Sequence, residues 1–561
     1  MGNLTGKTDR KNQTITYTYD QLNRLTGKTY PDNSTVNYSY SNVACGTLQC
    51  YTMTATDSIS GTITRTDDVL DRLASETTPQ GTVSYSYDAA GRRSSLTVPG
   101  QAIANYTFDN ANRLTQITQG STTVSFSYDN ANRRTTLTLP NGITTSYSYD
   151  NASQLTGLTY AKGSNTLGNL TYGYDLNGRR TNIAGSFAAT NLPNAVSTTA
   201  YNANNQLTTW GTANLFYDYN GNTLTKVVGS NTTTYGWDFE NRLTSVTLPG
   251  SGGTVSFRYD PFGRRIYKSS SSGTSIYAYD GDNLVEETNS SGAAVARYED
   301  TQNIDEPLAM LRSAATSYYH ADGLGSVTSL SSAAGSIANT YTYDSFGKLT
   351  ASTGSLVNPF QYTARESDAE TGLYYYRARY YDSNVGRFLN EDPPSFLSGG
   401  INFYEYVENS PLGFKDPNGL QAQPASTCCD PQKTKDILQQ LQNAFSGPAA
   451  AKSTVFQKYK PCLQKMLGDI TFQCGPPPPS QPTECGHTVV PGTVYLTPNG
   501  IAGKGGCKAA KSTVAHEMVH SCYNDIGPVL SGIDQEKEAY GIECQLFGLF
   551  CQCARNPKLC Q

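Results

Sequence analysis

The sequence has little charge, few histidines and no long apolar segment. Charged residues make up 16% of the 561 residues, hydrophobic residues 37%, and only 4 residues are histidine. The 41 basic and 46 acidic residues give a net charge of −5, which excludes the strongly basic surface of a nucleic-acid-binding protein. No run of about 18 apolar residues is present, so we expect no membrane-spanning helix. The first residues, MGNLTGKTDRKNQT, lack the apolar core of a signal peptide.

The residues that replace this missing charge are Ser, Thr, Asn, Gly and Tyr. The 40 tyrosines and the low net charge argue against a disordered chain and favour a repetitive β-structure with many turns. The composition changes at Leu420, because 36 of the 40 tyrosines precede residue 421 and 11 of the 13 cysteines follow it. A change this sharp predicts a domain boundary.

The tyrosine-rich part is a repeat. An aromatic residue and Asp are followed by Gly or Asn, a basic residue and another strand-like run, and Asp88, Asp109, Asp129 and Asp150 lie 21, 20 and 21 residues apart. The period of about 20 residues is too short for a propeller blade of about 40. The motif reads YDQLNRL, YDAAGRR, FDNANRL, YDNANRR, YDLNGRR, WDFENRL, YDPFGRR and YDSFGKL.

Each repeat predicts a β-hairpin. The segment TVSYSY before Asp88 alternates Thr or Ser with Val or Tyr, as in a strand with two unlike faces. Asp-x-x-Gly/Asn supplies turn residues, and RRSSLTV then returns as the second strand. Because one hairpin cannot bury its aromatic face, neighbouring hairpins must stack on one another. The fold class predicted is mainly β.

These repeats resemble the YD repeats of bacterial Rhs and toxin-complex proteins. The strings YYHADGLGSVTSL, TGLYYYRARYYDSNVGRFLNEDP and NFYEYVENSPLGFKDPNGL resemble the Rhs-associated core. The resemblance implies a strip of hairpins that spirals into a shell and a variable C-terminal cargo, commonly a toxin. We therefore predict YD repeats over 1–300, the core over 301–420, and a smaller, cysteine-rich α+β zincin-like domain over 421–561.

The resemblance also implies self-cleavage at the end of the core. Relatives are cut after the Leu of a motif that here reads PLGFKDPNGL, which places the scissile bond between Leu420 and Gln421. Asp416 and Asp392 are the predicted carboxylates, with Asp382 in reserve. Two carboxylates that share a proton can act as base and acid on a water molecule. The alternative is that Asp-Pro and Asn-Gly only form turns here.

The C-terminal segment contains the sequence His516-Glu517-Met518-Val519-His520 in a run that reads as a helix. Residues i and i+4 lie on one face of a helix, so both imidazoles can bind one zinc ion. Glu517 is then the base that takes a proton from zinc-bound water. Chance would place such a motif in this chain about 0.002 times. The alternative is a solvated helix with one buried histidine.

The third zinc ligand is predicted downstream. The segment resembles zinc peptidases of the gluzincin kind, whose second helix supplies a Glu in an E-x-x-A setting, and Glu536 fits this pattern with Glu538 as the alternative. The metzincin pattern is absent from HEMVHSCYNDI. His487 is predicted in a loop. The strand predicted over 493–498 matches the edge strand with which such enzymes pair a peptide substrate.

The 11 cysteines after residue 420 have the density of a disulfide-stapled extracellular domain. We expect disulfides to form after export, and therefore a secreted or surface-delivered protein.

The function predicted is a polymorphic toxin whose shell carries a Zn²⁺-dependent peptidase. Its partners would be a protein substrate in a target cell, a cognate immunity protein and a delivery apparatus, with no nucleic acid. The alternative is a non-catalytic surface protein for adhesion or carbohydrate binding with an inert C-terminal cap. A third hypothesis retains the metal but gives it a non-peptide amide substrate.

Overall fold

The computed structural model describes residues 2–45, 48–176, 178–188, 191–393, 402–420, 423–424, 471–474, 486–490 and 493–496. The chain divides into two compact units, Met1–Gln423 and Pro424–Gln561. Among the described residues, no helix has the length and apolar character needed to cross a membrane.

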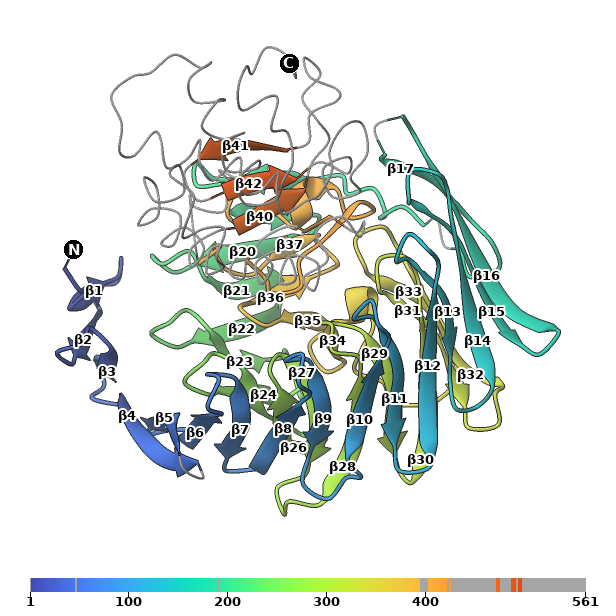
Figure 1. The fold of residues 1–561 in the computed structure, drawn as a ribbon. Helices are drawn as coiled ribbons and strands as arrows, with labels where there is room; N and C mark the ends of the chain where they lie inside the picture. Colours follow the sequence, from blue (N-terminus) through green and yellow to red (C-terminus); the bar gives the residue numbers. More distant parts are fainter. Residues whose placement is uncertain are drawn as a thin grey trace, which may run out of the picture. The chain divides into compact units, whose positions relative to one another are not determined.

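The first unit is built from two large antiparallel sheets (Figure 1). Each strand pairs with the next strand along the chain, as the repeat predicts, so the mainly β fold class is confirmed for these residues. The seventeen-stranded first sheet contains β1 (Gly6–Thr8), β2 (Thr14–Tyr19), β3 (Leu25–Thr29), β4 (Thr35–Cys45), β5 (Leu48–Asp57), β6 (Gly61–Asp67), β7 (Leu73–Thr78), β8 (Gly81–Tyr87), β9 (Arg93–Thr97), β10 (Ala104–Phe108), β11 (Leu114–Gln119), β12 (Thr122–Tyr128), β13 (Arg134–Thr138), β14 (Ile143–Tyr149), β15 (Leu155–Lys162), β16 (Asn165–Tyr174) and β17 (Arg180–Ala184).

The second sheet has sixteen strands and continues the same pattern into the predicted core region. It contains β18 (Thr199–Tyr201), β19 (Leu207–Trp210), β20 (Ala213–Tyr217), β21 (Thr223–Val228), β22 (Asn231–Trp237), β23 (Leu243–Thr247), β24 (Thr254–Tyr259), β25 (Arg265–Ser270), β26 (Gly273–Asp280), β27 (Asn283–Thr288), β28 (Ala294–Asp300), β29 (Pro307–Arg312), β30 (Ala315–Ala321), β31 (Val327–Ser332), β32 (Ile337–Tyr343) and β33 (Leu349–Thr353).

The Asp of the repeat folds the turn between two strands, and we call this turn a YD turn. In the turn that begins at Asp109, Oδ1 accepts hydrogen bonds from the backbone N–H groups of Ala111 and Arg113 at 2.9 and 3.0 Å. Oδ2 accepts a bond from Arg113 Nε at 2.7 Å. Asn112 has a φ of 62°, a left-handed conformation that Asn and Gly adopt more readily than other residues. Asp, Asn or Gly, and Arg therefore each have a distinct structural role at their own position in this turn.

The same arginine also binds the next hairpin. Arg113 Nη1 donates to the carbonyl oxygen of Asp129 and to Asn132 Oδ1, both at 3.1 Å, and its guanidinium lies 5.0 Å from the ring centre of Tyr128. Tyr128 donates its hydroxyl to the carbonyl of Leu114 at 2.7 Å. Arg92, Arg133, Arg242 and Arg264 make the same kind of bond to a backbone carbonyl of the following turn, so an arginine at this position links one YD turn to the next.

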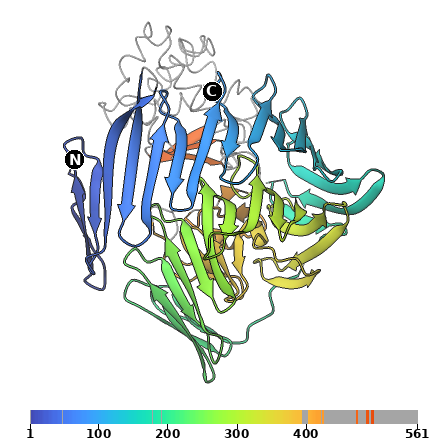
Figure 2. The same ribbon diagram turned by 90° about the horizontal axis from the view of Figure 1, so that it is seen from below.

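The two sheets pack against each other along their length (Figure 2). Val124, Ile117 and Leu137 of the first sheet share a buried cluster with Leu308 and Tyr318 of the second. Ion pairs also join the sheets at residues far apart in the sequence, and they include Lys28–Glu240, Glu76–Arg264, Arg93–Asp280 and Arg134–Glu306.

The core segment, which is here defined as the described residues of 354–420 that follow β33, packs on the tyrosine-rich face of the second sheet. Phe360, Tyr376 and Tyr406 share a buried cluster with Tyr298 and Tyr319 of that sheet. Its short elements are η1 (Tyr362–Ala364), β34 (Glu366–Asp368), β35 (Leu373–Tyr376), β36 (Arg379–Asp382), β37 (Arg387–Phe388), η3 (Val407–Asn409) and β38 (Phe414–Lys415), followed by β39 (Gln423–Pro424).

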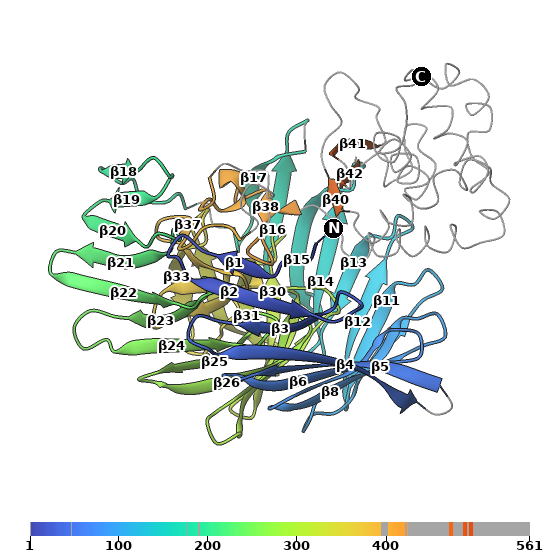
Figure 3. The same ribbon diagram turned by 90° about the vertical axis from the view of Figure 1, so that its left-hand side faces the viewer.

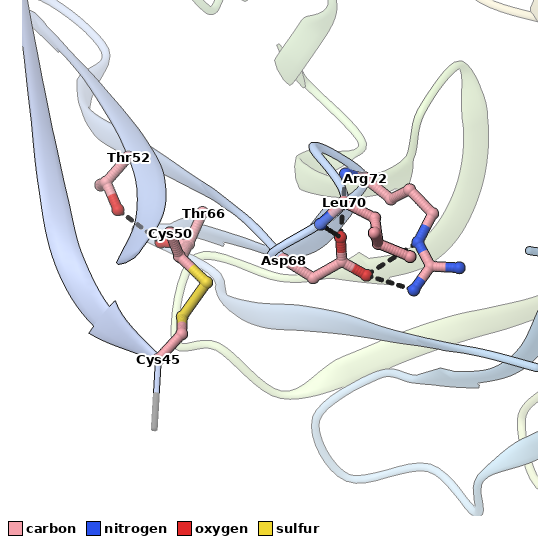
Figure 4. The surroundings of a disulfide bond; sticks show 7 residues. All are labelled: Cys45, Cys50, Thr52, Thr66, Asp68, Leu70 and Arg72. Atoms are coloured by element: carbon pink, nitrogen blue, oxygen red, sulfur yellow. Dashed lines mark hydrogen bonds and ion pairs between the residues drawn. A yellow bond between two sulfur atoms is a disulfide. The ribbon is translucent and has the colours of Figure 1, made fainter. Parts of the chain in front are cut away.

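Hairpin β4–β5 is longer than the other hairpins and extends past its neighbours (Figure 3). A disulfide joins Cys45 and Cys50 near its tip (Figure 4), with Cα atoms 5.7 Å apart. Sequence reasoning assigned no pair to these two cysteines.

The second unit is described for three strands, β40 (Thr471–Cys474), β41 (Gly486–Val490) and β42 (Thr493–Leu496). The strand predicted over 493–498 is present as β42. The prediction that it is an edge strand is wrong, because β42 lies between β40 and β41. His487 lies in β41 and not in the predicted loop. The predicted helices and cysteine pairs of 421–561 lie outside the described residues.

Candidate self-cleavage site

The end of the core segment lies against the hairpin β35–β36. Ala378 N–H in the hairpin turn donates to the carbonyl of Asn418 at 3.2 Å, and Arg377 Nη1 donates to the carbonyl of Pro417. Gly419 follows with a φ of 69°, and a Cβ at this position would lie 2.2 Å from the carbonyl oxygen of Tyr376. Only glycine lets the backbone at residue 419 lie this close to the Tyr376 carbonyl, and this explains the Gly of the DPNGL sequence.

Asp416 holds the residue that precedes the predicted scissile bond. Its Oδ1 accepts a hydrogen bond from the Leu420 N–H at 3.0 Å. The Leu420 carbonyl carbon is two covalent bonds from that nitrogen, a separation of about 2.5 Å. Asp416 is 2% exposed, so this contact is shielded from water. The carboxylate is therefore fixed close to the Leu420 carbonyl.

Asp392 reaches the same place from a different part of the core segment. Its backbone N–H donates to the carbonyl of Phe403 at 2.9 Å, and its Oδ2 lies 3.7 Å from Arg379 Nη2. The same nitrogen lies 3.3 Å from Asp416 Oδ2. The structure thus brings together the two carboxylates that the sequence singled out, which lie 24 residues apart in the chain.

Arg379 is the residue that the sequence reasoning missed. Its Nε donates to the carbonyl of Gly419, its Nη1 donates to the carbonyl of Phe403 at 3.1 Å, and the guanidinium stacks 3.7 Å from the ring centre of Phe388. Burial lowers the pKa of Arg379, and the charges of Asp416 and Asp392 oppose that shift. A guanidinium between two carboxylates offsets part of the repulsion between them, and the proton that we predicted them to share stays a prediction. The sequence does contain a signal for Arg379, which is its position within YYYRARYYD. An arginine inside a tyrosine-rich strand is expected to be buried and therefore to need charged or polar partners.

The reserve residue Asp382 has another role. Its Oδ2 binds Lys226 Nζ at 3.1 Å, and its Oδ1 accepts the backbone N–H of Asn384 at 2.9 Å. Asp382 therefore caps its own turn and ties it to the second sheet.

The predicted zinc site of His516, His520, Glu517 and Glu536 or Glu538 lies outside the described residues. Within the part of the chain that the structure does describe, no group of three or more His, Cys, Asp or Glu side chains is arranged to hold a metal ion.

The fold and the core segment define a class of protein, one in which walls of YD hairpins enclose a tyrosine-rich core segment. The Teneurin YD-shell family model matches residues 76–165 and 143–412, which together cover 337 of the 561 residues, and the RHS Repeat model matches residues 2–35. The chain therefore belongs to the YD-shell family.

Several relatives of this chain are named as toxins or as nucleases. It is 36% identical over 114 residues to Double-stranded DNA deaminase toxin A of Burkholderia cenocepacia, which is 19% of this chain and 8% of that protein. It is 28% identical over 229 residues to tRNA3(Ser)-specific nuclease WapA of Bacillus spizizenii, covering 39% of this chain and 10% of that protein. It is 34% identical over 110 residues to Toxin protein Tse5 of Pseudomonas aeruginosa, covering 20% and 8%. The matched segments thus span a tenth or less of these relatives.

The same fold occurs in a solved structure. The structure described as TcdB2-TccC3 has a TM-score of 0.52 with this chain at 17% sequence identity, and the match covers 75% of this chain and 29% of the other. This similarity concerns the fold.

Proposed function

We propose that this chain is a toxin carrier whose core segment cuts the bond between Leu420 and Gln421 and so releases the C-terminal unit as a hydrolytic cargo. The observation that carries the proposal is the hydrogen bond from Leu420 N–H to Asp416, beside an arginine that also contacts Asp392. The toxins among the relatives support a cargo that acts on a target cell.

The two carboxylates divide the chemistry of hydrolysis between them. One accepts a proton from water, whose oxygen attacks the Leu420 carbonyl carbon. The other starts in the protonated form, because the pair shares one proton, and donates that proton to the nitrogen of Gln421 as the peptide bond breaks. Arg379 keeps both carboxylates beside the bond and withdraws electron density from the neighbouring Gly419 carbonyl. The products are a new carboxyl group on Leu420 and a new amino group on Gln421.

Cleavage is tested on the full chain by following the fragments 1–420 and 421–561 and by sequencing the new N-terminus. Asp392→Asn and Asp416→Asn should each abolish cleavage, because an amide can neither accept nor donate the required proton. Asp382→Asn is the matched control, since Asp382 is also a buried aspartate of the core segment but binds Lys226. Equal cleavage in all three variants would refute the proposal.

The cargo is proposed to be a zinc-dependent peptidase. His516, His520 and Glu536 form the donor set, and imidazole and carboxylate ligands with one open position suit catalytic zinc. When bound, zinc supplies a Lewis acid that lowers the pKa of a coordinated water. Glu517 would be the general base, holding a proton taken from water and passing it to the leaving amine. The proposal is supported by the motif and by the scarcity of histidine in the chain.

Glu517→Gln tests this proposal, since it removes the base and leaves the metal ligands in place. Proteolysis or toxicity should fall by a hundredfold or more, as loss of a general base costs about 10²–10⁴. Glu536→Gln should lower zinc affinity, and Glu538→Gln is its matched control two residues away. Unchanged activity of Glu517→Gln in zinc-loaded protein would favour the alternative of an inert cap on an adhesion or carbohydrate-binding surface.

The proposed partners follow from this function. They are a delivery apparatus, a protein substrate in the target cell and an immunity protein that protects the producing cell. A gene next to that of this chain whose product blocks its toxicity would establish the last of these.

A further inference from the structure

The first YD turn of the chain lies against a turn of the second sheet that begins at Asp218. Asn220 Nδ2 donates to Asp9 Oδ2 at 2.7 Å, and the Arg10 N–H donates to Asn220 Oδ1 at 3.1 Å. Arg10 Nη2 also donates to the carbonyl of Asn220 at 2.6 Å. Two turns that are about 210 residues apart in the sequence are thus joined by three hydrogen bonds.

The turn at Asp218 is incomplete by itself. Many YD turns carry an arginine four residues after their Asp, as in Asp238–Arg242 and Asp260–Arg264. The residue four positions after Asp218 is Asn222, which donates to Asp218 Oδ2 at 3.1 Å but carries no charge. Lys11 Nζ lies 3.1 Å from Asp218 Oδ2 and supplies the missing cation. Asp218 is 8% exposed in its side chain, so the pair is shielded. The turn therefore depends on the first hairpin for its counter-ion.

Arg10 also contacts Glu391, the residue next to Asp392. Arg10 Nη2 lies 2.5 Å from Glu391 Oε2, and the Tyr404 hydroxyl lies within 3.4 Å of Glu391 Oε1. Tyr404 also donates to the carbonyl of Gly221 at 2.7 Å. Glu391 is thus held between the first hairpin and the second sheet.

Asp392 depends on this arrangement because its backbone follows directly. The carbonyl of Leu389 accepts hydrogen bonds from Thr223 N–H and Thr223 Oγ1 at 2.9 and 2.7 Å, and Asp392 N–H donates to Phe403. Glu391 lies between these two anchored residues, and the peptide bond that joins it to Asp392 is the route by which a shift of Glu391 would reach the Asp392 carboxylate.

We propose that the first hairpin is a latch, formed by Asp9, Arg10 and Lys11, that positions Asp392 for cleavage through Glu391. Arg10 is then a positioning residue, and cleavage becomes efficient only when the hairpin β1–β2 has docked on the second sheet. This inference rests on the proposed self-cleavage and adds a control over its timing, since the latch and the scissile bond are separated by about 410 residues of chain.

The experiment measures two quantities in the full chain, which are the rate of cleavage and the hydrogen exchange of peptides covering residues 387–393. Arg10→Ala should slow cleavage by about tenfold or more, because small displacements of catalytic groups have effects of this size. It should also raise exchange at Asp392. Arg10→Lys should recover part of both. The matched control is Lys7→Ala, which removes an exposed cation from β1 of the same hairpin.

The outcomes separate the latch from the self-cleavage proposal. Parent-like cleavage and exchange in Arg10→Ala would overturn the latch, as would equal slowing in Lys7→Ala, which would indicate general loss of stability. If the parent chain is not cut, the self-cleavage proposal fails. In that case the hydrogen exchange of residues 387–393 alone tests whether the latch holds this segment. Faster exchange in Arg10→Ala would support docking of the hairpin, and unchanged exchange would overturn it.

Discussion

Arg265 Nη1 and Asp368 Oδ2 lie 2.5 Å apart, and both side chains are 1% exposed. Arg265 begins β25 of the second sheet and Asp368 ends β34 of the core segment. Arg265 Nη2 also pairs with Glu366 Oε2 at 2.7 Å. One arginine therefore neutralises two buried carboxylates and fixes the core segment to the wall.

Arg265→Leu should destabilise the first unit by about 3–5 kcal/mol, because it removes the nearest cation from two buried carboxylates. Asp368 would keep Lys268 at 3.3 Å, and Glu366 would keep Arg365 at 3.9 Å. The measurement is the free energy of unfolding in denaturant. Arg258→Leu is the control, since Arg258 is exposed on the neighbouring strand β24 and stacks on Tyr267. If the two variants lose the same stability, the buried pair does not fix the core segment.

The stability of the fold should fall in acid because of His320. Its side chain is 1% exposed, Nε2 lies 2.8 Å from Ser331 Oγ, and burial lowers the pKa of His320 from 6.5 to about 4. Between pH 6.5 and 4 the unfolded chain binds the proton and the folded chain does not. The contribution of neutral His320 to the free energy of unfolding is therefore complete above pH 6.5. It is lost as pH falls to 4, an effect of about 3 kcal/mol.

Glu299 has the opposite effect on stability, because burial raises the pKa of Glu299 to about 7. Its contribution to the free energy of unfolding is lost as pH rises from 4.5 to 7. The His320→Gln variant isolates the histidine. The difference in unfolding free energy between parent and variant should shrink by about 3 kcal/mol from pH 7 to pH 4. A constant difference would show that His320 does not titrate in this way.

Asp109→Ala should cost about 1–2 kcal/mol, since it removes two hydrogen bonds to backbone N–H groups and the ion pair with Arg113. Asn110→Ala in the same turn is exposed and should cost little. Chemical denaturation of both variants provides the comparison. Hydrogen exchange should also rise in the following turn at Asp129, because Arg113 is released from Asp109.

Metal removal should inactivate the released fragment 421–561. We expect peptide hydrolysis only from oxidised, zinc-loaded protein, with loss on adding chelator or reductant, since disulfides stabilise small domains by about 2–5 kcal/mol. Activity of the fully reduced fragment would refute the role of disulfides and leave the zinc proposal intact. Activity of metal-free protein would refute the ligand assignment.

The hairpin strip could be predicted from sequence because its causes are local. Asp109, Asn112 and Arg113 satisfy one another within five residues, and alternation in the flanking strands sets the buried face. The pairing of the sheets could not be predicted, since nothing near Lys28 or Arg93 in the sequence indicates a partner about 200 residues away.

The two aspartates of the candidate site could be predicted from the sequence, and the arginine between them could not. Asp392 and Asp416 came from a resemblance in sequence strings, and the structure brings both to Arg379. Arg379 itself was missed because its charge is balanced only by residues that the fold brings together. The edge strand was wrongly predicted because strand order depends on tertiary pairing, while residues 493–496 determine only that a strand forms.

The ion pairs between the two walls make the lengths of the walls depend on each other. A YD hairpin bonds only to its neighbours, so a hairpin could be duplicated within one wall without new local contacts. However, a duplication between Lys28 and Arg93 would carry Arg93 and Arg134 one hairpin past Asp280 and Glu306. Repeats of this protein should therefore be gained or lost in matched pairs, one in each of the two large sheets. The number of hairpins between two ion pairs that join the sheets should stay constant among related chains.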